Sequence, residues 1–427
     1  MIQSFDRVRE SMYTHTLPNG LRIYYIPKPG FSKTFAMIAT KFGSIDQHFV
    51  LEDGTKVQVP AGVAHFLEHK MFEGEDGNAL QKFAATGACP NAFTSQDRTA
   101  FFFSCTDRFN ENLEILMNFM FKPHFTAENV QKEKGIIEQE ICMMADMAPM
   151  QAMNGLYKGL YQRHPIRMQV GGTVESIAQI TPDILYTCYQ AFYSPSNMVL
   201  TVCGNADWQT ICSIAQRYSP EKAVHIAARD YGDSQPEVCQ HEIIKELPVA
   251  HAIFRIGFKD TPLQPGENAF QRKLLGDLCC RLLGGQTAPL YTELYREGMI
   301  NRTFSSTYGL YPEAAHGIFG GHSLNPQAAC ARIEAEVQRL ATQGVPPALF
   351  ERMKRASYGM QLRVLDQPDA VCMMQCGAAL YGQDFMAFAA LYDKMTANDV
   401  QQMLKRWAQP NHTSRFIFMP QGAERKG

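Results

Sequence analysis

The chain has 427 residues, of which 45% are hydrophobic, so it can form two or three domains with substantial cores. Its 40 Lys and Arg residues nearly balance 42 Asp and Glu residues, and no long basic run is present, which excludes nucleic acid as a partner. No window approaches the roughly 20 uninterrupted apolar residues of a membrane span, and the first residues lack the apolar core of a signal peptide. We therefore expect a cytoplasmic protein with no membrane partner.

The twelve cysteines include no C-x-x-C pair. A disulfide framework and a thiolate zinc site both need cysteines at regular or paired spacings, so neither is predicted. We expect buried, reduced thiols instead.

Hydrophobic periodicity and turn residues predict the following elements in chain order. Strands are predicted within 17–27, 35–44, 88–94, 99–106 and 197–205, and helices within 62–74, 108–121 and 126–146. The second half opens in a similar way, with strands within 242–258 and a helix at 268–285 that runs into glycines. This similarity predicts an internal duplication.

Residues 219–238 mix Pro, Gly, Asp and Ser without periodicity, as is typical of a linker. The sequence therefore predicts a first domain at 1–225, a linker at 226–238 and a second domain at 239–427.

The segment "GVAHFLEHKMFEG", residues 62–74, places two histidines and a glutamate among apolar residues. Residues i and i+4 of a helix lie one above the other, so His65 and His69 can bind one ion, with Glu68 beside them. Imidazole suits zinc, and a zinc ion with an open position lowers the pKa of its bound water to about 7. A neighbouring carboxylate can then take the proton. The alternative is a pair of histidines satisfied by hydrogen bonds on a partly buried helix.

Two histidines leave a zinc site incomplete, and "VQKEKGIIEQEICMM", residues 130–144, is the best source of a third ligand. On a helix, Glu133 and Glu140 share one face with Ile136, Ile137 and Met144, whereas Glu138 is turned away into solvent. A carboxylate on an apolar face is costly unless it is paired or binds a metal ion. The alternative is an amphipathic helix with partly exposed acids.

With these residues in place, the sequence resembles a known family of zinc peptidases. "HFLEH" is the reversed motif H-x-x-E-H of the inverzincins. The chain resembles the pitrilysin/insulinase family over nearly its full length, in the half-length bacterial branch that is similar to mitochondrial processing peptidase. The resemblance also includes "LPNGLRIYYIPKPG", "NAFTSQDRTAFFF", "EKGIIEQEI", "HPIRMQVGGTVESIAQIT", "FYSPSNMVLTVCGN" and "LLGGQTAPLYTELYREGMI".

The resemblance implies a role for each polar residue of these two segments. His65, His69 and Glu140 would bind one zinc ion per chain, and Glu68 would be the general base that activates the water. Glu133 would be the second acidic position, which supports the site without binding the metal. The first domain would then be the zinc-binding catalytic domain, and the second a homologous domain without metal.

In the family, a substrate peptide adds as a strand to a sheet edge that matches "PNAFT". The resemblance therefore implies that Asn91, Ala92 and Phe93 line the substrate. The alternative for this segment is an ordinary hairpin.

The chain departs from the family in its second half. Members that complete the site carry an Arg followed seven residues later by a Tyr, on a segment that matches "ELYREGMINRTFSS", where this chain has Tyr295 and Arg302. A phenol that would stabilise the oxyanion is therefore missing. A zinc-less paralogous subunit that carries the pair would complete a heterodimer. A homodimer in which Arg302 stabilises the oxyanion is the competing expectation.

The fold implied by the resemblance is α+β, with two tandem homologous domains that each pack an antiparallel sheet against helices. The implied function is a zinc endopeptidase that cleaves peptides or unfolded polypeptides inside a chamber formed with a partner subunit. The alternatives are a non-catalytic structural subunit of such a complex and a zinc-dependent hydrolase of a non-peptide amide.

Overall fold

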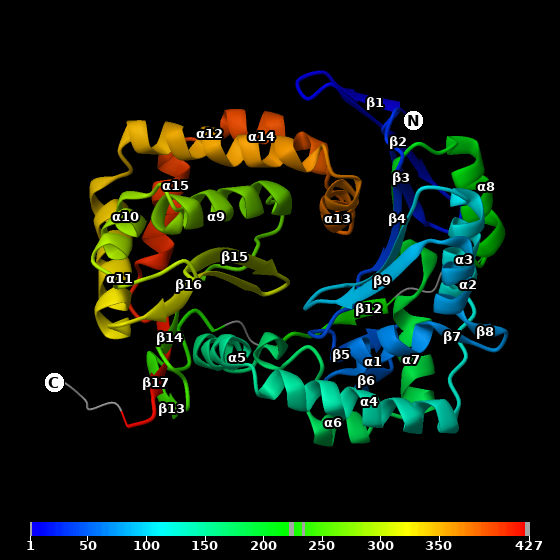
Figure 1. Ribbon diagram of the computed structural model, residues 1–427, viewed down its shortest axis with the longest axis horizontal. Coiled ribbons are helices and arrows are strands. Elements are labelled where there is room, and N and C mark those ends of the chain that lie inside the picture. The colour runs from blue at the N-terminus through cyan, green and yellow to red at the C-terminus, as the bar shows by residue number, and fades with distance from the viewer. Residues whose placement is uncertain (1, 222–225, 233–234, 423–427) are drawn as a thin grey trace. The chain divides into compact units, whose positions relative to one another are not determined.

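The computed structural model describes residues 2–221, 226–232 and 235–422 (Figure 1). The chain forms two compact units, and each is built from separate stretches of sequence. Unit 1 comprises Met1–Ile141, Gln169–Asp230 and Gln361–Ala389, and unit 2 comprises Cys142–Met168, Tyr231–Met360 and Ala390–Gly427. Compact units and homologous halves are different divisions of a chain, so the domain boundaries inferred from the sequence stay a prediction.

The first unit is a mixed sheet with helices, together with two small sheets. Its strands are β1 Ile2–Phe5, β2 Glu10–Thr16, β3 Arg22–Pro27, β4 Thr34–Thr40, β5 His48–Leu51, β6 Lys56–Gln58, β7 Glu73–Gly74, β8 Gly77–Asn78, β9 Cys89–Thr94, β10 Thr99–Cys105, β11 Met198–Gly204 and β12 Ile226–Arg229. Helices that lie wholly or mostly in it are α1 Val63–Met71, α2 Ala79–Thr86, α3 Phe109–Met120, α4 Ala127–Ala145, α6 Val174–Ala178, α7 Pro182–Phe192, α8 Trp208–Tyr218 and α13 Pro368–Ala379.

The second unit has one five-stranded sheet. Its strands are β13 Glu242–Leu247, β14 Ala252–Asp260, β15 Ser305–Tyr311, β16 Ala314–Ser323 and β17 Thr413–Pro420. Helices that lie wholly or mostly in it are α5 Ala148–Leu160, α9 Ala269–Gly284, α10 Pro289–Arg296, α11 Pro326–Gln343, α12 Pro347–Val364, α14 Phe388–Lys394 and α15 Ala397–Trp407. A short 3-10 helix lies at Pro165–Arg167 in this unit, and two others lie at Pro195–Asn197 and Phe385–Ala387 in unit 1.

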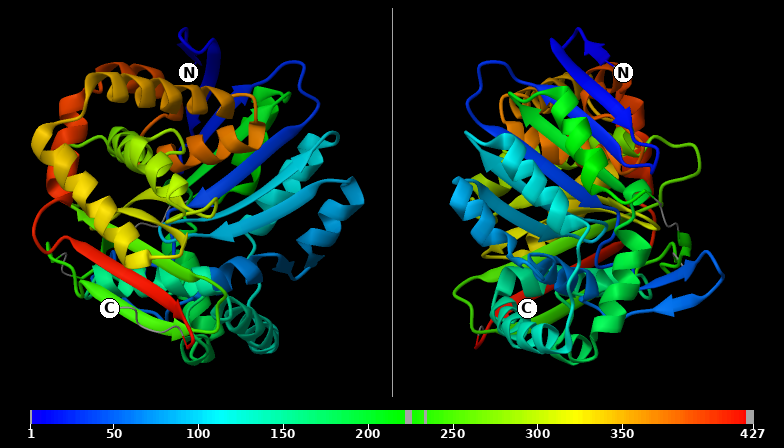
Figure 2. Two further views of the ribbon diagram at one scale, coloured as in Figure 1. Left: turned by 60° about the vertical axis from the view of Figure 1, so that its left-hand side comes forward. Right: turned by 90° about the vertical axis from the view of Figure 1, so that its right-hand side faces the viewer.

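The large sheets of the two units share one strand pattern. Unit 1 has the order β1-β2-β3-β11-β4-β10-β9 and unit 2 has the order β13-β17-β14-β16-β15. The pairs β3–β11 and β13–β17 are parallel, and the other pairs in these two sheets are antiparallel. The pattern supports the predicted duplication and the α+β class. The parallel pairs differ from the predicted antiparallel sheets because the last strand of each large sheet inserts between two earlier strands, β11 between β3 and β4 and β17 between β13 and β14, and runs parallel to the first of the two. The twist of the blue and cyan strands can be followed in Figure 2.

Strands β4 and β11 show why the sheet of unit 1 is apolar on both faces. Every residue of both strands is buried. Ala36 and Ile38 pack in the core with α1, α3 and α7. On the other face lies α13, where the Cys372 thiol donates to the backbone oxygens of Phe35 and Thr201 at 3.7 Å each. A strand that is covered on both faces reads as a continuous apolar run.

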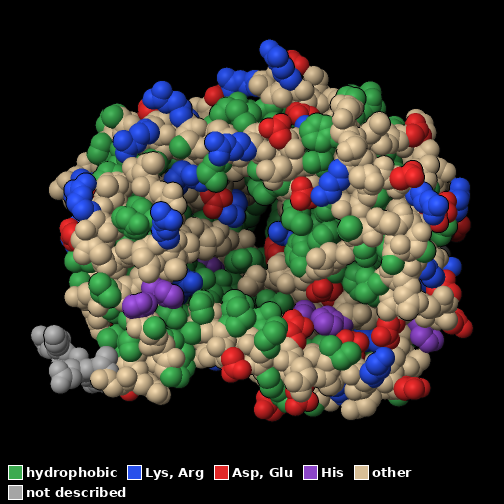
Figure 3. Space-filling model, in the orientation of Figure 1, with side chains coloured by type: hydrophobic (Ala, Val, Ile, Leu, Met, Phe, Trp, Pro, Cys, Tyr) green, Lys and Arg blue, Asp and Glu red, His purple; other side chains and the backbone are tan. Residues whose placement is uncertain are grey.

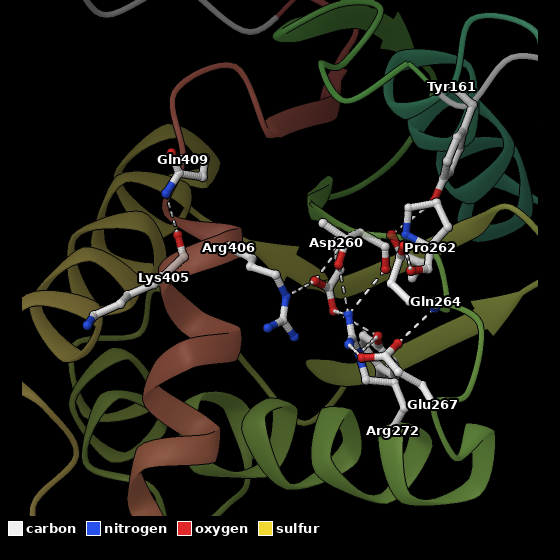
Figure 4. A network of polar contacts seen from close by, with 12 residues as sticks. Tyr161, Asp260, Pro262, Gln264, Glu267, Arg272, Lys405, Arg406 and Gln409 are labelled. Carbon is white, nitrogen blue, oxygen red and sulfur yellow. Dashed lines mark hydrogen bonds and ion pairs between the residues drawn. The ribbon is translucent and has the colours of Figure 1, made fainter.

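A buried ion network occupies the core of unit 2 (Figure 4). The Asp260 carboxylate accepts hydrogen bonds from Arg272 at 3.0 Å, from Arg406 at 2.7 Å and from the Tyr308 hydroxyl at 2.8 Å. Burial alone would raise the pKa of Asp260, but the two arginines and the tyrosine outweigh it and hold the pKa below its usual value. The carboxylate therefore stays ionised in the folded protein.

Three smaller expectations can be compared with the structure. All twelve cysteines are free of disulfide bonds, as predicted, but Cys89, Cys142 and Cys239 are exposed rather than buried. Part of the predicted linker is a strand, since Ile226–Arg229 forms β12 and pairs with β5. Residues 222–225 and 233–234 of the predicted boundary region lie outside the described residues. Among the described helices, none combines the length and apolar character that a bilayer crossing requires.

Candidate metal centre

Helix α1 begins at a close backbone contact that only glycine permits. Gly62 precedes its first residue with φ 90°, in the left-handed region, and a Cβ there would lie 2.5 Å from the backbone oxygen of Gly171. Gly172 makes the reciprocal contact. Its φ is 77°, also in the left-handed region, and a Cβ there would lie 2.4 Å from the backbone oxygen of Ala61. The glycines thus let residues 171–172 lie against the start of α1, one turn before His65.

Helices α1 and α4 bring the predicted ligands together. His65 Nε2 lies 3.5 Å from Glu140 Oε1, and His69 Nε2 lies 3.5 Å from Glu140 Oε2. One ligand atom from each of the three residues falls within 4.8 Å of the others, and all three side chains are partly exposed. Two atoms bound to one zinc at tetrahedral angles are about 3.3–3.6 Å apart, given bonds of about 2.0–2.2 Å, so the donor set fits zinc. Figure 3 shows histidine and acidic side chains together on the surface over α1 and α4.

Burial keeps the His65 ring in the form that binds a metal. It lowers the pKa of His65 to about 4, so the imidazole is neutral at pH 7. Its Nδ1 is buried and has no hydrogen-bond partner among the described residues. The neutral ring therefore faces Glu140 through Nε2, the nitrogen that could bind a metal ion in the tautomer with its proton on Nδ1.

Glu133 and Lys70 hold the other histidine. His69 Nδ1 lies 3.0 Å from Glu133 Oε1, so an Nδ1–H can donate and leave the Nε2 lone pair for a metal. Burial alone would lower the pKa of His69, but Glu133 outweighs it and raises the pKa. The Lys70 ammonium is fully buried, lies 3.5 Å from Glu133 Oε2 and also bonds Glu73. Burial would raise the pKa of Glu133, but His69 and Lys70 lower it, so the carboxylate is ionised.

Thr94 holds one oxygen of Glu68. The Thr94 hydroxyl donates to Glu68 Oε2 at 2.6 Å, and its oxygen lies 3.4 Å from the Thr99 hydroxyl, which donates to the Phe42 oxygen at 2.9 Å. Burial raises the pKa of Glu68, and the bond from Thr94 acts against that rise. Oε1 of Glu68 is left as the oxygen that can accept a proton.

The predicted face of α4 is correct in part. Glu133 and Ile137 are buried, Glu140 is partly exposed, and Glu138 is exposed as predicted. The prediction was wrong for Ile136, which is 49% exposed. Only a narrow stripe of α4, the one that faces α1, is covered. Ile136 lies outside this stripe and is therefore exposed.

The predicted substrate segment is an edge strand. Within the part of the chain that the structure describes, β9 pairs only with β10 in this sheet. Asn91 is exposed, whereas Ala92 and Phe93 are partly buried. Ala92 lies on the same strand face as Thr94, because alternate residues share a face, so it is on the side of Glu68.

The two residues at the family's Arg and Tyr positions lie in unit 2. Tyr295 is in the last turn of α10, 45% exposed and stacked on Tyr291 at 5.8 Å between ring centroids. Arg302 is exposed in the segment before β15.

Several residues around the site were not found from the sequence. Lys70 could have been found as a lysine on the apolar face of a predicted helix, and Thr94 ends the very motif that gave the substrate residues. Gly62 and Gly172 carried no signal, since their role depends on a contact between distant parts of the chain.

The chain is similar to known proteins in both of its halves. The family profile described as "Insulinase (Peptidase family M16)" matches residues 58–174, and the one described as "Peptidase M16 inactive domain" matches residues 179–357. The "Uncharacterized zinc protease YmfH" of Bacillus subtilis is 34% identical over 418 residues, covering 94% of this chain and 95% of that protein.

More distant similarity extends to a processing peptidase and to a solved structure. The "Mitochondrial-processing peptidase subunit beta" of Caenorhabditis elegans is 24% identical over 237 residues, covering 54% of this chain and 47% of that protein. A crystal structure of a "putative M16-like peptidase" from Alicyclobacillus acidocaldarius has a TM-score of 0.92 at 31% identity, covering 96% of this chain and 98% of that one.

Proposed function

Since the chain belongs to the insulinase family of M16 peptidases, we propose that it is a zinc endopeptidase that cleaves peptides or unfolded polypeptides. The observation that carries this proposal is the His65, His69 and Glu140 cluster beside a carboxylate, Glu68, that has one oxygen fixed and one oxygen free. A purely structural helix pair has no need of these four groups in one place.

In this proposal each residue has a distinct task. His65, His69 and Glu140 would hold zinc, which acts as a Lewis acid and lowers the pKa of a bound water to about 7. Glu68 would act as the general base through Oε1, because Thr94 occupies Oε2. Glu133 keeps the Nδ1–H of His69 in place.

The unpaired edge of β9 supports a peptide as the substrate. An extended chain can add to a free strand edge by main-chain hydrogen bonds, and this reads backbone rather than side chains. Asn91, Ala92 and Phe93 would line such a chain next to Thr94 and Glu68. A folded protein offers few extended segments, which favours unfolded polypeptides.

We further propose that the active form is a heterodimer with a zinc-less paralogue, which encloses the substrate in a chamber. Neither Tyr295 nor Arg302 is the residue that completes the site in the family, so the partner would supply the missing oxyanion donor. Losing one such donor costs about 10²–10³ in rate. The isolated chain should therefore be slow and the paralogue should restore that factor. If the isolated chain is fully active and Arg302→Ala abolishes its activity, the homodimer account replaces this one.

A second candidate function is a non-catalytic structural subunit. The match of residues 179–357 to an "inactive domain" profile favours it. The ligand cluster and Glu68 weigh against it, because a subunit without catalysis does not need a fixed general base.

Metal content tests the proposed site directly. Purified protein should hold about one zinc per chain, and His65→Ala and Glu140→Gln should each lose it. Glu138→Gln is the matched control, since it makes the same change on an exposed residue of the same helix. Zinc retained in both ligand variants would remove the site.

Cleavage of an unbiased peptide mixture, with and without chelator, tests the activity. Glu68→Gln should keep zinc and cleave about 10²–10⁴ times more slowly. Cleavage that persists at the original rate in Glu68→Gln would refute the assigned base. No cleavage by the wild-type chain, alone or with its paralogue, would favour the structural subunit.

A further inference from the structure

Three hydroxyl groups of unit 1 lie near Glu68. Thr94 on β9 and Thr99 on β10 are paired residues of neighbouring strands, and their hydroxyl oxygens are 3.4 Å apart. Thr99 is fully buried and Thr94 is partly buried. The third hydroxyl belongs to Tyr193, which directly follows helix α7 and is 3% exposed. Helix α7 packs on α1, the helix that carries Glu68 (Figure 1).

Aromatic contacts place the Tyr193 ring next to Thr99. The ring lies edge-on to Phe42 at 6.5 Å between centroids and tilted against Phe101 at 6.4 Å. Thr99 donates a hydrogen bond to the Phe42 backbone oxygen and stands two residues before Phe101 on β10. The ring also stacks on Tyr189 at 5.1 Å. These contacts fix the position of Tyr193 through its ring and do not involve its hydroxyl.

The Tyr193 hydroxyl itself has no structural partner. Its oxygen is buried and makes no full hydrogen bond with any residue that the structure describes. The Tyr189 hydroxyl, by contrast, donates to the Met120 backbone oxygen at 2.9 Å. Burial raises the pKa of Tyr193 most and the charge of Glu68 raises it next, whereas a contact with the Thr99 side chain, short of hydrogen-bond geometry, acts against the rise. Thr99 and Glu68 are therefore the polar side chains that this phenol meets.

The protons of the three hydroxyls show what Tyr193 can supply. A hydroxyl has one proton to donate and two lone pairs that accept. Thr94 donates its proton to Glu68 Oε2 at 2.6 Å, and Thr99 donates its proton to the Phe42 oxygen. Neither proton lies between the two threonine oxygens, and the proton of Tyr193 is the one left over. A donation from Tyr193 to Thr99, with the Thr99 proton turned to Thr94, joins all three hydroxyls to Glu68.

We propose that Tyr193 is a positioning residue for the general base and acts through the chain Tyr193–Thr99–Thr94–Glu68. A hydroxyl that accepts a hydrogen bond becomes a stronger donor, so Tyr193 strengthens the bond from Thr94 to Glu68. This task accounts for a buried hydroxyl that packing does not need and that costs free energy when it is unsatisfied. The inference rests on the proposed function, because Glu68 acts as a base only in a peptidase.

Tyr193→Phe removes only the hydroxyl and tests the proposal through kcat and KM for one peptide at one fixed pH. Cooperative strengthening is about 10–30% of a hydrogen bond to a charged group, which converts to a loss of about two- to fivefold in kcat. KM and zinc content should stay unchanged, because the variant alters neither the metal ligands nor the free edge of β9. Tyr189→Phe is the matched control. It removes a hydroxyl that has a partner, so it should lower Tm more than Tyr193→Phe does and leave kcat unchanged.

A double-mutant cycle with Thr94→Val shows whether Tyr193 acts through the chain. Thr94→Val cuts the last link, so adding Tyr193→Phe to it should lower kcat no further. The proposal is overturned if Tyr193→Phe keeps the wild-type kcat, if its loss of kcat persists in Thr94→Val, or if its Tm falls as far as that of Tyr189→Phe. When only this inference fails, the wild-type chain still cleaves the peptide and Glu68→Gln does not. When the proposed function fails, the wild-type chain cleaves no peptide, alone or with its paralogue, and the role of Tyr193 fails with it.

Discussion

Replacing Thr94 by valine tests whether the hydroxyl that holds Glu68 matters for catalysis. Valine keeps the shape of threonine and removes only the donor. The Thr94–Glu68 bond is 2.6 Å long, within the range of charge-assisted O–H···O⁻ bonds, and the Thr94 side chain is partly buried. Without it, Glu68 is free to turn, and its ionised form loses a favourable contact.

The size of the effect follows from the energy of such a bond. A hydrogen bond to a charged group contributes about 1.5–3 kcal/mol, and one pKa unit corresponds to about 1.36 kcal/mol. Removing a donor from a carboxylate raises its pKa. The pKa of Glu68 in Thr94→Val should therefore rise by about one to two units. A base must be ionised to act, so the acid limb of the pH–rate profile should move upward by the same amount.

The assay is kcat/KM for one peptide measured across pH, together with zinc content and Tm. At the pH of the wild-type acid limb, Thr94→Val should be about tenfold to a hundredfold slower, and it should recover at higher pH. Thr94→Ser restores the hydroxyl and should restore the profile. An unmoved acid limb in Thr94→Val, with zinc and Tm unchanged, would refute the role of this hydrogen bond.

Three further changes act on the metal centre, the core of unit 2 and the start of α1. Lys70→Met removes the buried partner of Glu133 and should weaken zinc binding about 10–100-fold in a chelator competition; unchanged affinity would contradict the assigned support of His69. Asp260→Asn should lower the free energy of unfolding by about 3–5 kcal/mol at pH 7, measured with urea. Because the folded-state pKa of Asp260 is lowered, the stability difference between wild type and Asp260→Asn should have its full size above about pH 4 and disappear as the pH falls further. A stability difference that grows in acid would contradict the assigned role of the ionised carboxylate. Gly62→Ala should lower Tm more than Gly54→Ala. Both glycines have a similar positive φ, 90° and 86°, but a Cβ on Gly62 would meet other atoms within 4 Å and a Cβ on Gly54 would not. Equal losses of Tm would show that the backbone strain accounts for the whole effect and the close contact for none of it.

The cluster of His65, His69 and Glu140 could be predicted because its signal is local. His65 and His69 are one helical turn apart, so their common face follows from the helix alone. Glu140 needed one further step, the face of a second helix, and the distances of 3.5 Å to both histidines agree with it. Ile136 shows where this reasoning ends. A hydrophobic residue at the right spacing is buried only if another element covers it, and sequence periodicity does not show how much of the helix face is covered.

Features that depend on contacts between distant segments could not be predicted. Residues 361–389 belong to unit 1, where α13 packs on β4 and β11. No sequence pattern in α13 indicates that it packs on these two strands. The Thr94 bond to Glu68 joins a strand to a helix, and its geometry requires the strand register. Arg255 did leave a local signal, as a charge inside "AHAIFRIGF", but the sequence does not show that its Nε is buried without a hydrogen-bond partner among the described residues.

The central strands of the two units differ on one face, although the strand pattern is shared. Strand β4 lies between β11 and β10, and β14 takes the same place between β17 and β16. The row of β4 on the α13 side contains Phe35, Met37 and Ala39, all buried, which shows that this position of the fold is satisfied by apolar side chains. The corresponding face of β14 carries Arg255 and Lys259 instead. Since the framework does not require charge there, the two cations are a feature of β14 alone, and among the described residues Lys259 is held by the backbone oxygens of Gln235 and Glu237.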